Sequence, residues 1–380
     1  MNKILSVVMI ILFCFTACAG FATADQQKVD RKFNISFSPD GKKLLFNRDK
    51  SDQSYTIQTY NMETGELIAY RSPIGERWVY PRYSFDGKYI AFVTFPLEII
   101  HIKELFHSKE GSIIVPDKSQ IAVMDEDGKN VRKITNTNGY KMYPSFSHSG
   151  KKVIFARSVI MEKRPQRGIK WAVHEVNLET GKETCLTEFK FMLMSRPYYF
   201  PDDKTFIFWG DYLTLASGMS DDRSHEDFLK VEKIRKELES KYKDNSIYVM
   251  QANEKELKPY LVTHDNEKTT NRYFVSTEYS RHPSLSADGS VLIFMARGYK
   301  PDGSADGDHL YQYSADGNHR SITRIPSTET EEAVSPDGKQ IALIPAYSNK
   351  IVKIVIYQVK DGTSREITLP AQPSRIINNQ

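Results

Sequence analysis

Six side chains of mixed chemistry recur at one position of a repeated phrase in this chain. Each lies seven residues before the last residue of a short polar turn, and four of them precede a proline. They are Asn34, Tyr80, Tyr143, Arg196, His282 and Glu331. Aromatic rings, a guanidinium, an imidazole and a carboxylate can together hold a polar ligand or a peptide. The alternative is that these side chains bond to one another and to water.

The phrase that carries this set occurs six times, for example as FSPDGKKLLF at 37–46 and VSPDGKQIAL at 334–343. In the first copy Pro39 presets φ, Asp40 can bond to its own backbone and Gly41 tolerates a positive φ, so a turn is expected. The apolar run that follows each turn is typical of a short buried strand. The equivalent acids are expected to stabilise turns rather than catalyse, since they lie on different repeats: Asp40, Asp86, Asp288 and Asp337.

A second element follows each phrase, such as QIAVMDEDGKNVRKIT at 120–135, and reads as a β-hairpin. Two hairpins make four strands, which is the size of one propeller blade. The repeats therefore predict an all-β fold: a six-bladed β-propeller of four-stranded antiparallel blades. Because the first strand of each blade lines the central channel of a propeller, the six side chains named above would ring one end of it. We refer to these six residues as the channel ring.

Two stretches interrupt the blades, at 96–119 and 211–245. In the second, apolar residues recur at three- and four-residue spacing, which predicts one helical insertion. They are Phe228, Val231, Ile234, Leu238 and Tyr242. This helix would either pack on its own propeller or serve as a partner-binding helix or lid.

The N-terminal residues read as an export signal, with Lys3 followed by an apolar stretch over 4–15 that is too short to span a bilayer. Cleavage after Ala24 would remove residues 1–24. A lipoprotein signal over 1–17 would instead leave Cys18 lipidated. Either route places the protein in the periplasm or outside the cell, and the second would anchor it to the outer membrane. The expected organisation continues with an N-terminal segment at 25–32, the propeller at 33–370 and a tail at 371–380.

Composition limits the classes of partner. The net charge is +4, 26% of residues are charged, and no basic tract stands out, which argues against nucleic acid. Contact with a membrane is expected only through a lipid anchor, and the protein is expected to be a monomer. Cys185 is the one cysteine beyond the signal region, so no intramolecular disulfide is expected. It reads as a small buried apolar residue rather than a reactive thiol.

Metal and cofactor signals are weak. Asp302, Ser304, Asp306 and Asp308 fall in a stretch that partly matches a calcium loop, but Tyr313 replaces the glutamate expected at the twelfth position. A solvated loop is favoured there, metal binding stays open, and no cofactor is predicted.

The S-P-D-G-K-K phrase, followed by I-Y-V-M at 247–250 and by a closing I-T, resembles the WD-like propeller repeat of the TolB family. The resemblance covers about 33–369. It implies a scaffold of the bacterial cell envelope that binds a protein or peptide, since TolB-like proteins act with outer-membrane lipoproteins and the Tol system. TolB itself has a separate domain before its propeller, and no counterpart is recognised in this chain, so those partners carry over only as an expectation.

An enzymatic function is the alternative to a binding scaffold. Similar propellers precede prolyl-oligopeptidase-type hydrolases, but no G-x-S-x-G nucleophile motif occurs in this chain. The related oligogalacturonate lyases build a metal site from dispersed channel histidines, and in this chain His282 falls in the channel register. The first hypothesis is thus an exported protein-binding scaffold without catalysis. The second is a channel-site carbohydrate-binding protein or oligosaccharide lyase, with or without dependence on a metal.

Overall fold

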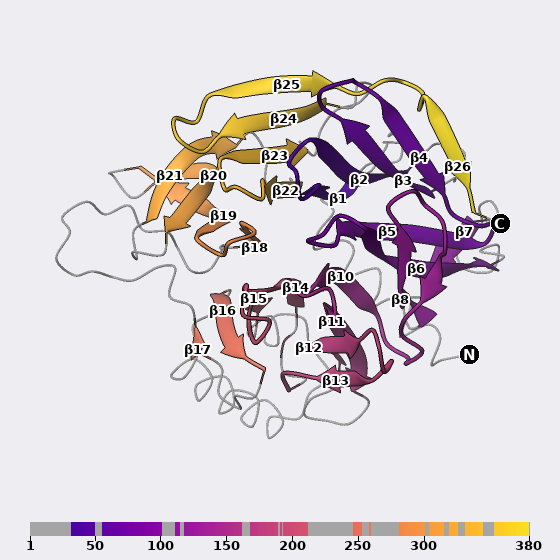
Figure 1. Cartoon of the computed structure of the whole chain (residues 1–380). Coiled ribbons are helices and arrows are strands. Elements are labelled where there is room, and N and C mark those ends of the chain that lie inside the picture. The colour runs from indigo at the N-terminus through magenta and orange to yellow at the C-terminus, as the bar shows by residue number, and fades with distance from the viewer. Residues whose placement is uncertain are drawn as a thin grey trace.

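The computed structural model describes fourteen stretches of the chain. These are residues 32–49, 55–100, 111–114, 118–161, 168–188, 191, 193–211, 246–252, 258–259, 281–300, 304–314, 319–325, 331–344 and 353–379. The strands in these stretches form six sheets, antiparallel except for one C-terminal strand, which are arranged as blades around one axis (Figure 1).

The blades follow one another along the chain. Blade one consists of β1 (Lys32–Phe37), β2 (Lys43–Asp49), β3 (Tyr55–Asn61), β4 (Leu67–Arg71) and the C-terminal β26 (Arg375–Asn378). Blade two consists of β5 (Glu76–Tyr83), β6 (Tyr89–Ile100), β7 (Gly111–Ile114), β8 (Gln120–Asp125) and β9 (Arg132–Lys133). Blade three consists of β10 (Lys141–Phe146), β11 (Lys152–Met161), β12 (Gly168–Asn177) and β13 (Glu183–Cys185).

The second half repeats the pattern. Blade four consists of β14 (Leu193–Tyr199), β15 (Thr205–Asp211), β16 (Ser246–Gln251) and β17 (Lys258–Pro259). Blade five consists of β18 (Arg281–Leu285), β19 (Val291–Tyr299), β20 (Ala305–Ser314) and β21 (His319–Ile325). Blade six consists of β22 (Glu331–Val334), β23 (Gln340–Ile344), β24 (Lys353–Gln358) and β25 (Ser364–Thr368).

The first strands of the six blades surround the axis. In the order β1, β5, β10, β14, β18 and β22, each packs beside the next, and β22 packs beside β1 to close the ring. Figure 1 shows these six labels nearest the centre of the molecule. The prediction of a six-bladed propeller with four-stranded blades is confirmed.

The predicted fold needs one correction, because it included a helical insertion. No α-helix occurs in the described stretches, so the helical part of the prediction is wrong. The five apolar residues that suggested it fall in 212–245, outside the described residues. Periodic apolar spacing is a local signal, and a short helix is stable only where the rest of the fold gives it a surface to pack on.

The apolar core lies between blades rather than within them. One cluster joins blades six and one through residues such as Ile35, Leu44 and Ile354. A second joins blades two and three through residues such as Val123 and Phe155. Each of the other four neighbouring blade pairs shares a cluster of the same kind. Each blade therefore depends on its neighbours to bury its two faces.

The repeated turns have the geometry that their sequence predicts. In the first copy the amide of Gly41 donates to the carbonyl of Ser38 at 2.9 Å, and Gly41 has a φ of 72°. The Asp40 carboxylate accepts from the Ser38 hydroxyl and from the amide of Lys42 at 3.0 Å. Asp86, Asp288 and Asp337 repeat this arrangement, so the prediction that these acids stabilise turns is confirmed.

The segment expected to be a C-terminal tail contains β26, which pairs in parallel with β4. It covers the outer edge of blade one, and Ile377 lies close to the loop glycine Gly128 of blade two. The last strand of the chain thus joins the first blade, as Figure 1 shows.

The strand directions define two faces. Each first strand runs toward its polar turn, so all six turns lie on one face. The opposite face carries the starts of the first strands and the connections between second and third strands. The chain leaves that second face after Asp211 and returns to it at Ser246, because Gly210 pairs with Ser246. The stretch at 96–119 also connects there, where β6 extends to Ile100 and pairs with β7.

Candidate functional site

The channel ring lies on the first strands, and its backbone is unusual. Five of its members have a positive φ between 49° and 59°: Asn34, Tyr80, Tyr143, Arg196 and His282. At each of them the pairing between the first and second strands shifts register, which is a β-bulge. In blade six, where Glu331 pairs regularly with Ile344, no shift occurs.

A bulge re-aims a side chain that would otherwise point toward a neighbouring blade. The left-handed conformation costs a non-glycine residue about 1–2 kcal/mol. It recurs here in five blades at the same position, and such local strain clusters at functional sites. Backbone geometry therefore singles out the same positions that the sequence register singled out.

One half of the channel ring is aromatic. The rings of Tyr80 and Tyr143 lie 4.5 Å apart between centroids, tilted by 48°. The Tyr80 hydroxyl contacts the Met142 sulfur at 3.6 Å, and burial raises the pKa of Tyr80 well above its usual value. Both tyrosines are half-buried as whole residues. Asn34 is buried nearby, and its amide donates to the Pro81 carbonyl at 3.4 Å.

The other half is charged. Arg196 is only 1% exposed, and its Nη1 donates to Oε1 of Glu332 at 2.7 Å and to the Glu332 carbonyl at 3.0 Å. Its Nη2 bonds to Glu331. Burial lowers the pKa of Arg196, but the two carboxylates outweigh that effect and raise it above the ordinary arginine value. Nδ1 of His282 lies 3.7 Å from Oε2 of Glu332, and its side chain stays 23% exposed.

The members of the channel ring thus differ in their exposure to solvent. Arg196 and Asn34 are buried and bonded to their neighbours, which fits the alternative of mutual bonding. Tyr80, Tyr143, His282 and Glu331 are half-buried, so each keeps some exposure to solvent. All six lie on the face that also carries the connections into 96–119 and 211–245.

Two functional candidates near the channel ring were not predicted. Glu332 follows Glu331, and Arg82 follows the Tyr80–Pro81 pair. Arg82 donates from Nη1 to the Tyr198 hydroxyl at 2.8 Å, and its Cζ lies 4.1 Å from the centroid of the Tyr198 ring. Both residues follow a channel-ring position within two residues on the same first strand, and that spacing was the available signal.

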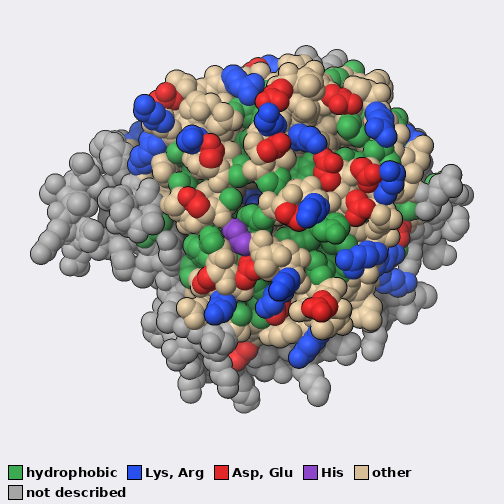
Figure 2. Space-filling model, viewed as in Figure 1, with side chains coloured by type: hydrophobic (Ala, Val, Ile, Leu, Met, Phe, Trp, Pro, Cys, Tyr) green, Lys and Arg blue, Asp and Glu red, His purple; other side chains and the backbone are tan. Residues whose placement is uncertain are grey.

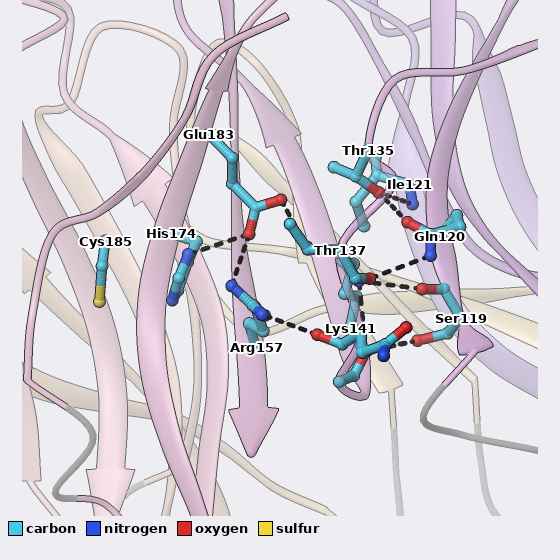
Figure 3. A network of polar contacts seen from close by, with 12 residues as sticks. Ser119, Gln120, Ile121, Thr135, Thr137, Lys141, Arg157, His174, Glu183 and Cys185 are labelled. Atoms are coloured by element: carbon cyan, nitrogen blue, oxygen red, sulfur yellow. Dashed lines mark hydrogen bonds and ion pairs between the residues drawn. The ribbon is translucent and has the colours of Figure 1, made fainter.

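A second polar cluster lies between blades two and three, as Figure 3 shows. Glu183 accepts from Arg157 at 2.9 Å and from Thr137 at 2.7 Å, and it lies 3.1 Å from Nδ1 of His174. The buried Lys141 ammonium donates to the carbonyls of Thr137, Ser119 (3.0 Å) and Gly139 (3.3 Å). Because Lys141 of blade three bonds to Ser119 of blade two, we assign the cluster to the attachment of the two blades.

Cys185, on the outer strand β13, corrects a prediction. It is exposed, so the expectation of a buried apolar residue is wrong. Outer strands face solvent on one side, and a short sequence does not reveal which strand of a blade it forms. Its thiol donates to the Thr187 carbonyl at 2.7 Å, and partial burial raises its pKa, which keeps the less reactive protonated form.

The other residues predicted to form sites lie partly outside the described stretches. Cys18 and Asp302 lie outside the described residues. Asp306 and Asp308 fall in strand β20, where Asp306 contacts His309 at 3.2 Å and Arg324 at 3.7 Å. Ser304 precedes that strand, and its carbonyl accepts from the Lys300 amide. The calcium-loop prediction stays a prediction.

The described residues bear on the metal-dependent form of the lyase alternative. No group of three histidine, cysteine, aspartate or glutamate side chains there is arranged to hold a metal ion. His282 lies near Glu332, and Arg196 bonds to one oxygen of Glu332 and to one oxygen of Glu331. The same stretches hold no helix long and apolar enough to cross a membrane.

Charges are mixed over the face seen in Figure 2. Lys and Arg side chains alternate there with Asp and Glu, hydrophobic side chains gather toward the middle, and a histidine reaches the surface among them. This face therefore presents no field of a single sign.

Comparison with known proteins supports the fold. No protein-family model matches the chain. It is 28% identical over 110 residues to the Tol-Pal system protein TolB of Rickettsia prowazekii, a match that covers 29% of this chain and 21% of that protein. The chain thus matches about a fifth of the length of that relative.

Two solved structures have the same architecture. TolB from Acinetobacter baumannii superposes with a TM-score of 0.55 at 17% identity, over 95% of this chain and 68% of that one. An oligogalacturonate lyase in complex with manganese gives a TM-score of 0.51 at 14% identity, over 89% of this chain and 77% of that one. The partial sequence match and the six blades fit a TolB-like propeller.

Proposed function

We propose that this protein is an exported scaffold of the cell envelope that binds a protein or peptide at the channel ring and performs no catalysis. The recurring left-handed bulge carries the proposal. It turns the same position of five blades at a strain cost, and two of those positions are half-exposed tyrosines in contact with each other. Tyrosine is enriched at binding hot spots because it combines a large apolar ring with a polar tip.

The position of the channel ring on one face of the propeller supports this proposal. The channel ring lies on the face where the chain connects into its two long interruptions, so both are anchored around the same mouth of the propeller. Binding loops held by a rigid scaffold are a common functional arrangement. The partial sequence match to a protein of the Tol-Pal system agrees with a partner in the cell envelope.

The N-terminal residues support export, since Lys3 and the apolar stretch 4–15 have the form of a signal. Cleavage after Ala24 and lipidation of Cys18 are both compatible with a site in the periplasm. Mass determination of the mature N-terminus would separate these two routes.

The lyase alternative has less support. A likeness to the manganese-bound lyase at 14% identity speaks only to the fold. The carboxylate near His282 is that of Glu332, which bonds to Arg196 through its other oxygen.

The test is recovery of a partner by in-cell crosslinking, pull-down of the tagged protein and mass spectrometry. The variant should combine Tyr143→Ala with His282→Ala, since both side chains are half-exposed. Arg196 is unsuitable, because its loss would leave Glu332 buried without its cation. Tyr89→Ala, at an exposed tyrosine beside a turn on the opposite face, is the matched control.

We expect a discrete envelope protein with the wild type and the control, and at least tenfold less of it with the double variant. Equal recovery by all three proteins would show that the channel ring does not bind the partner.

A further inference from the structure

Arg82 lies just beyond the channel ring on its strand and bonds to a residue two blades away. It sits two residues after Tyr80 on β5, in blade two. Its partner Tyr198 is on β14 in blade four, and β10 of blade three packs between those two strands. The guanidinium therefore reaches past the inner strand of blade three, near the axis of the molecule.

The two arginines near the axis differ in how their charge is balanced. Arg196 has two carboxylates within bonding distance. Arg82 forms no ion pair with any described residue, and its contacts there are the hydroxyl and the ring face of Tyr198. Burial and the nearby charge of Arg196 lower the pKa of Arg82, whereas Tyr198 partly compensates.

The guanidinium also keeps free donors. One N–H of Nη1 is engaged by the Tyr198 hydroxyl, and the other N–H groups have no partner in the described part of the protein. The side chain is half-buried rather than sealed, so a ligand can reach it. A planar fork of donors in a partly desolvated place matches a carboxylate, which it can hold with two parallel bonds.

We infer that Arg82, held by Tyr198, is an anion subsite that takes a carboxylate from an acidic segment of the partner. This inference rests on the proposed function and adds the chemistry of the bound peptide. The aromatic pair Tyr80–Tyr143, starting two residues away on the same strand, would contact the apolar part of that segment. The segment is thus expected to alternate acidic and apolar or aromatic residues.

The test uses synthetic peptides and the mature full-length protein. The first peptide is a fluorescein-labelled 12-residue sequence with repeats of Glu-Tyr-Gly, amidated at its C-terminus. The second replaces each glutamate by glutamine. The third is the glutamine peptide with a free C-terminal carboxylate, which separates side-chain from terminal carboxylates. Fluorescence anisotropy gives the affinities at two ionic strengths.

We expect the glutamate peptide to bind at least tenfold more tightly than the amidated glutamine peptide, with an affinity that falls as salt rises. Arg82→Gln should remove that preference. Arg132→Gln, on the exposed outer strand of the same blade, should keep it. Arg82→Lys keeps the charge but not the fork, so it should lose part of the preference and serves if Arg82→Gln does not fold.

Binding of both amidated peptides with equal affinity, or an unchanged preference in both Arg82 variants, would overturn the subsite. So would binding of trigalacturonate with no binding of any peptide. If the pull-down yields a partner that depends on Tyr143 and His282 but not on Arg82, the subsite fails and the scaffold stands. If neither assay shows binding, both proposals fail.

Discussion

Arg196 shows how one residue of the channel ring can be structural while its neighbours stay available. It is held by Glu331 and Glu332 from blade six, across the position of His282 in blade five. A buried ion pair of this kind is weak evidence for net stability, but removing one partner leaves a charge without compensation. We expect it to fix how blade four faces blade six.

Replacing Glu332 by alanine should therefore be costly. The change leaves the buried Arg196 with Glu331 alone, and the expected loss is about 3–5 kcal/mol of the free energy of unfolding. Urea denaturation followed by tryptophan fluorescence measures it. Glu366→Ala is the control, since Glu366 pairs with Lys353 on the exposed surface and should cost at most about 1 kcal/mol. Equal losses in the two variants would contradict a buried, mutually dependent pair.

His174 predicts a pH dependence of stability. Burial lowers its pKa in the folded protein below the ordinary value of 6.5, despite the nearby Glu183. The unfolded chain therefore binds the proton more readily, and stability falls as the pH drops below about 6.5. His174→Gln should reduce the loss of stability between pH 7 and pH 5, measured by thermal unfolding at each pH. A slope identical to that of the wild type would show that His174 is not the group responsible.

At the scale of elements, the recurring device is a turn that packs on the turn of the next blade. A Cβ at Gly338 would lie 2.9 Å from a methyl of Val291 in blade five. The Ala287 amide also donates to the Pro336 carbonyl at 3.0 Å. A Cβ at Gly41 would meet nothing within 4 Å, although its φ of 72° is almost the same as that of Gly338.

This pair of glycines separates backbone strain from packing between blades. Gly41→Ala should cost about 1–2 kcal/mol from the left-handed conformation alone. Gly338→Ala carries the same strain and an additional steric conflict, so it should destabilise by more. Chemical denaturation of both variants gives the difference. A smaller loss for Gly338→Ala than for Gly41→Ala would show that the turns do not support one another.

The sequence predicted much at this scale, and its failures have physical causes. The S-P-D-G turns are local, because Asp40 and Gly41 form them from neighbouring residues, so they were readable. The bulges were not predicted, because left-handed φ values at tyrosine, arginine and histidine contradict the local preference of these residues. The closed propeller imposes these values. The prolines after four channel-ring residues, such as Pro81 and Pro197, were the available sign. The contact of Arg82 with Tyr198 joins blades far apart in the chain, and periodicity carries no such information.

At the scale of the whole molecule, closure depends on both ends of the chain. The first strands close the ring where β22 meets β1, and β26 adds to the outer edge of blade one. Ile377 is half-buried near Gly128 of blade two, whereas Ile376 is 40% exposed on the same strand. The C-terminal strand thus contributes apolar contacts where blades one and two meet.

Two adjacent isoleucines test this contribution. Ile377→Ala should lower the free energy of unfolding by about 1–2 kcal/mol, given the usual cost of losing a partly buried aliphatic side chain. Ile376→Ala should change it by less than about 0.5 kcal/mol. Differential scanning calorimetry of both variants provides the comparison. Equal effects would indicate that β26 does not pack against blade two.

The most direct test of the central claim is photocrosslinking in the cell from single positions. A photoreactive phenylalanine analogue replaces Tyr143 in the channel ring or, in a second strain, Tyr89 on the opposite face. We predict that position 143 crosslinks to one discrete envelope protein and that position 89 does not. A partner captured equally from both positions, or from position 89 alone, would contradict binding at the channel ring.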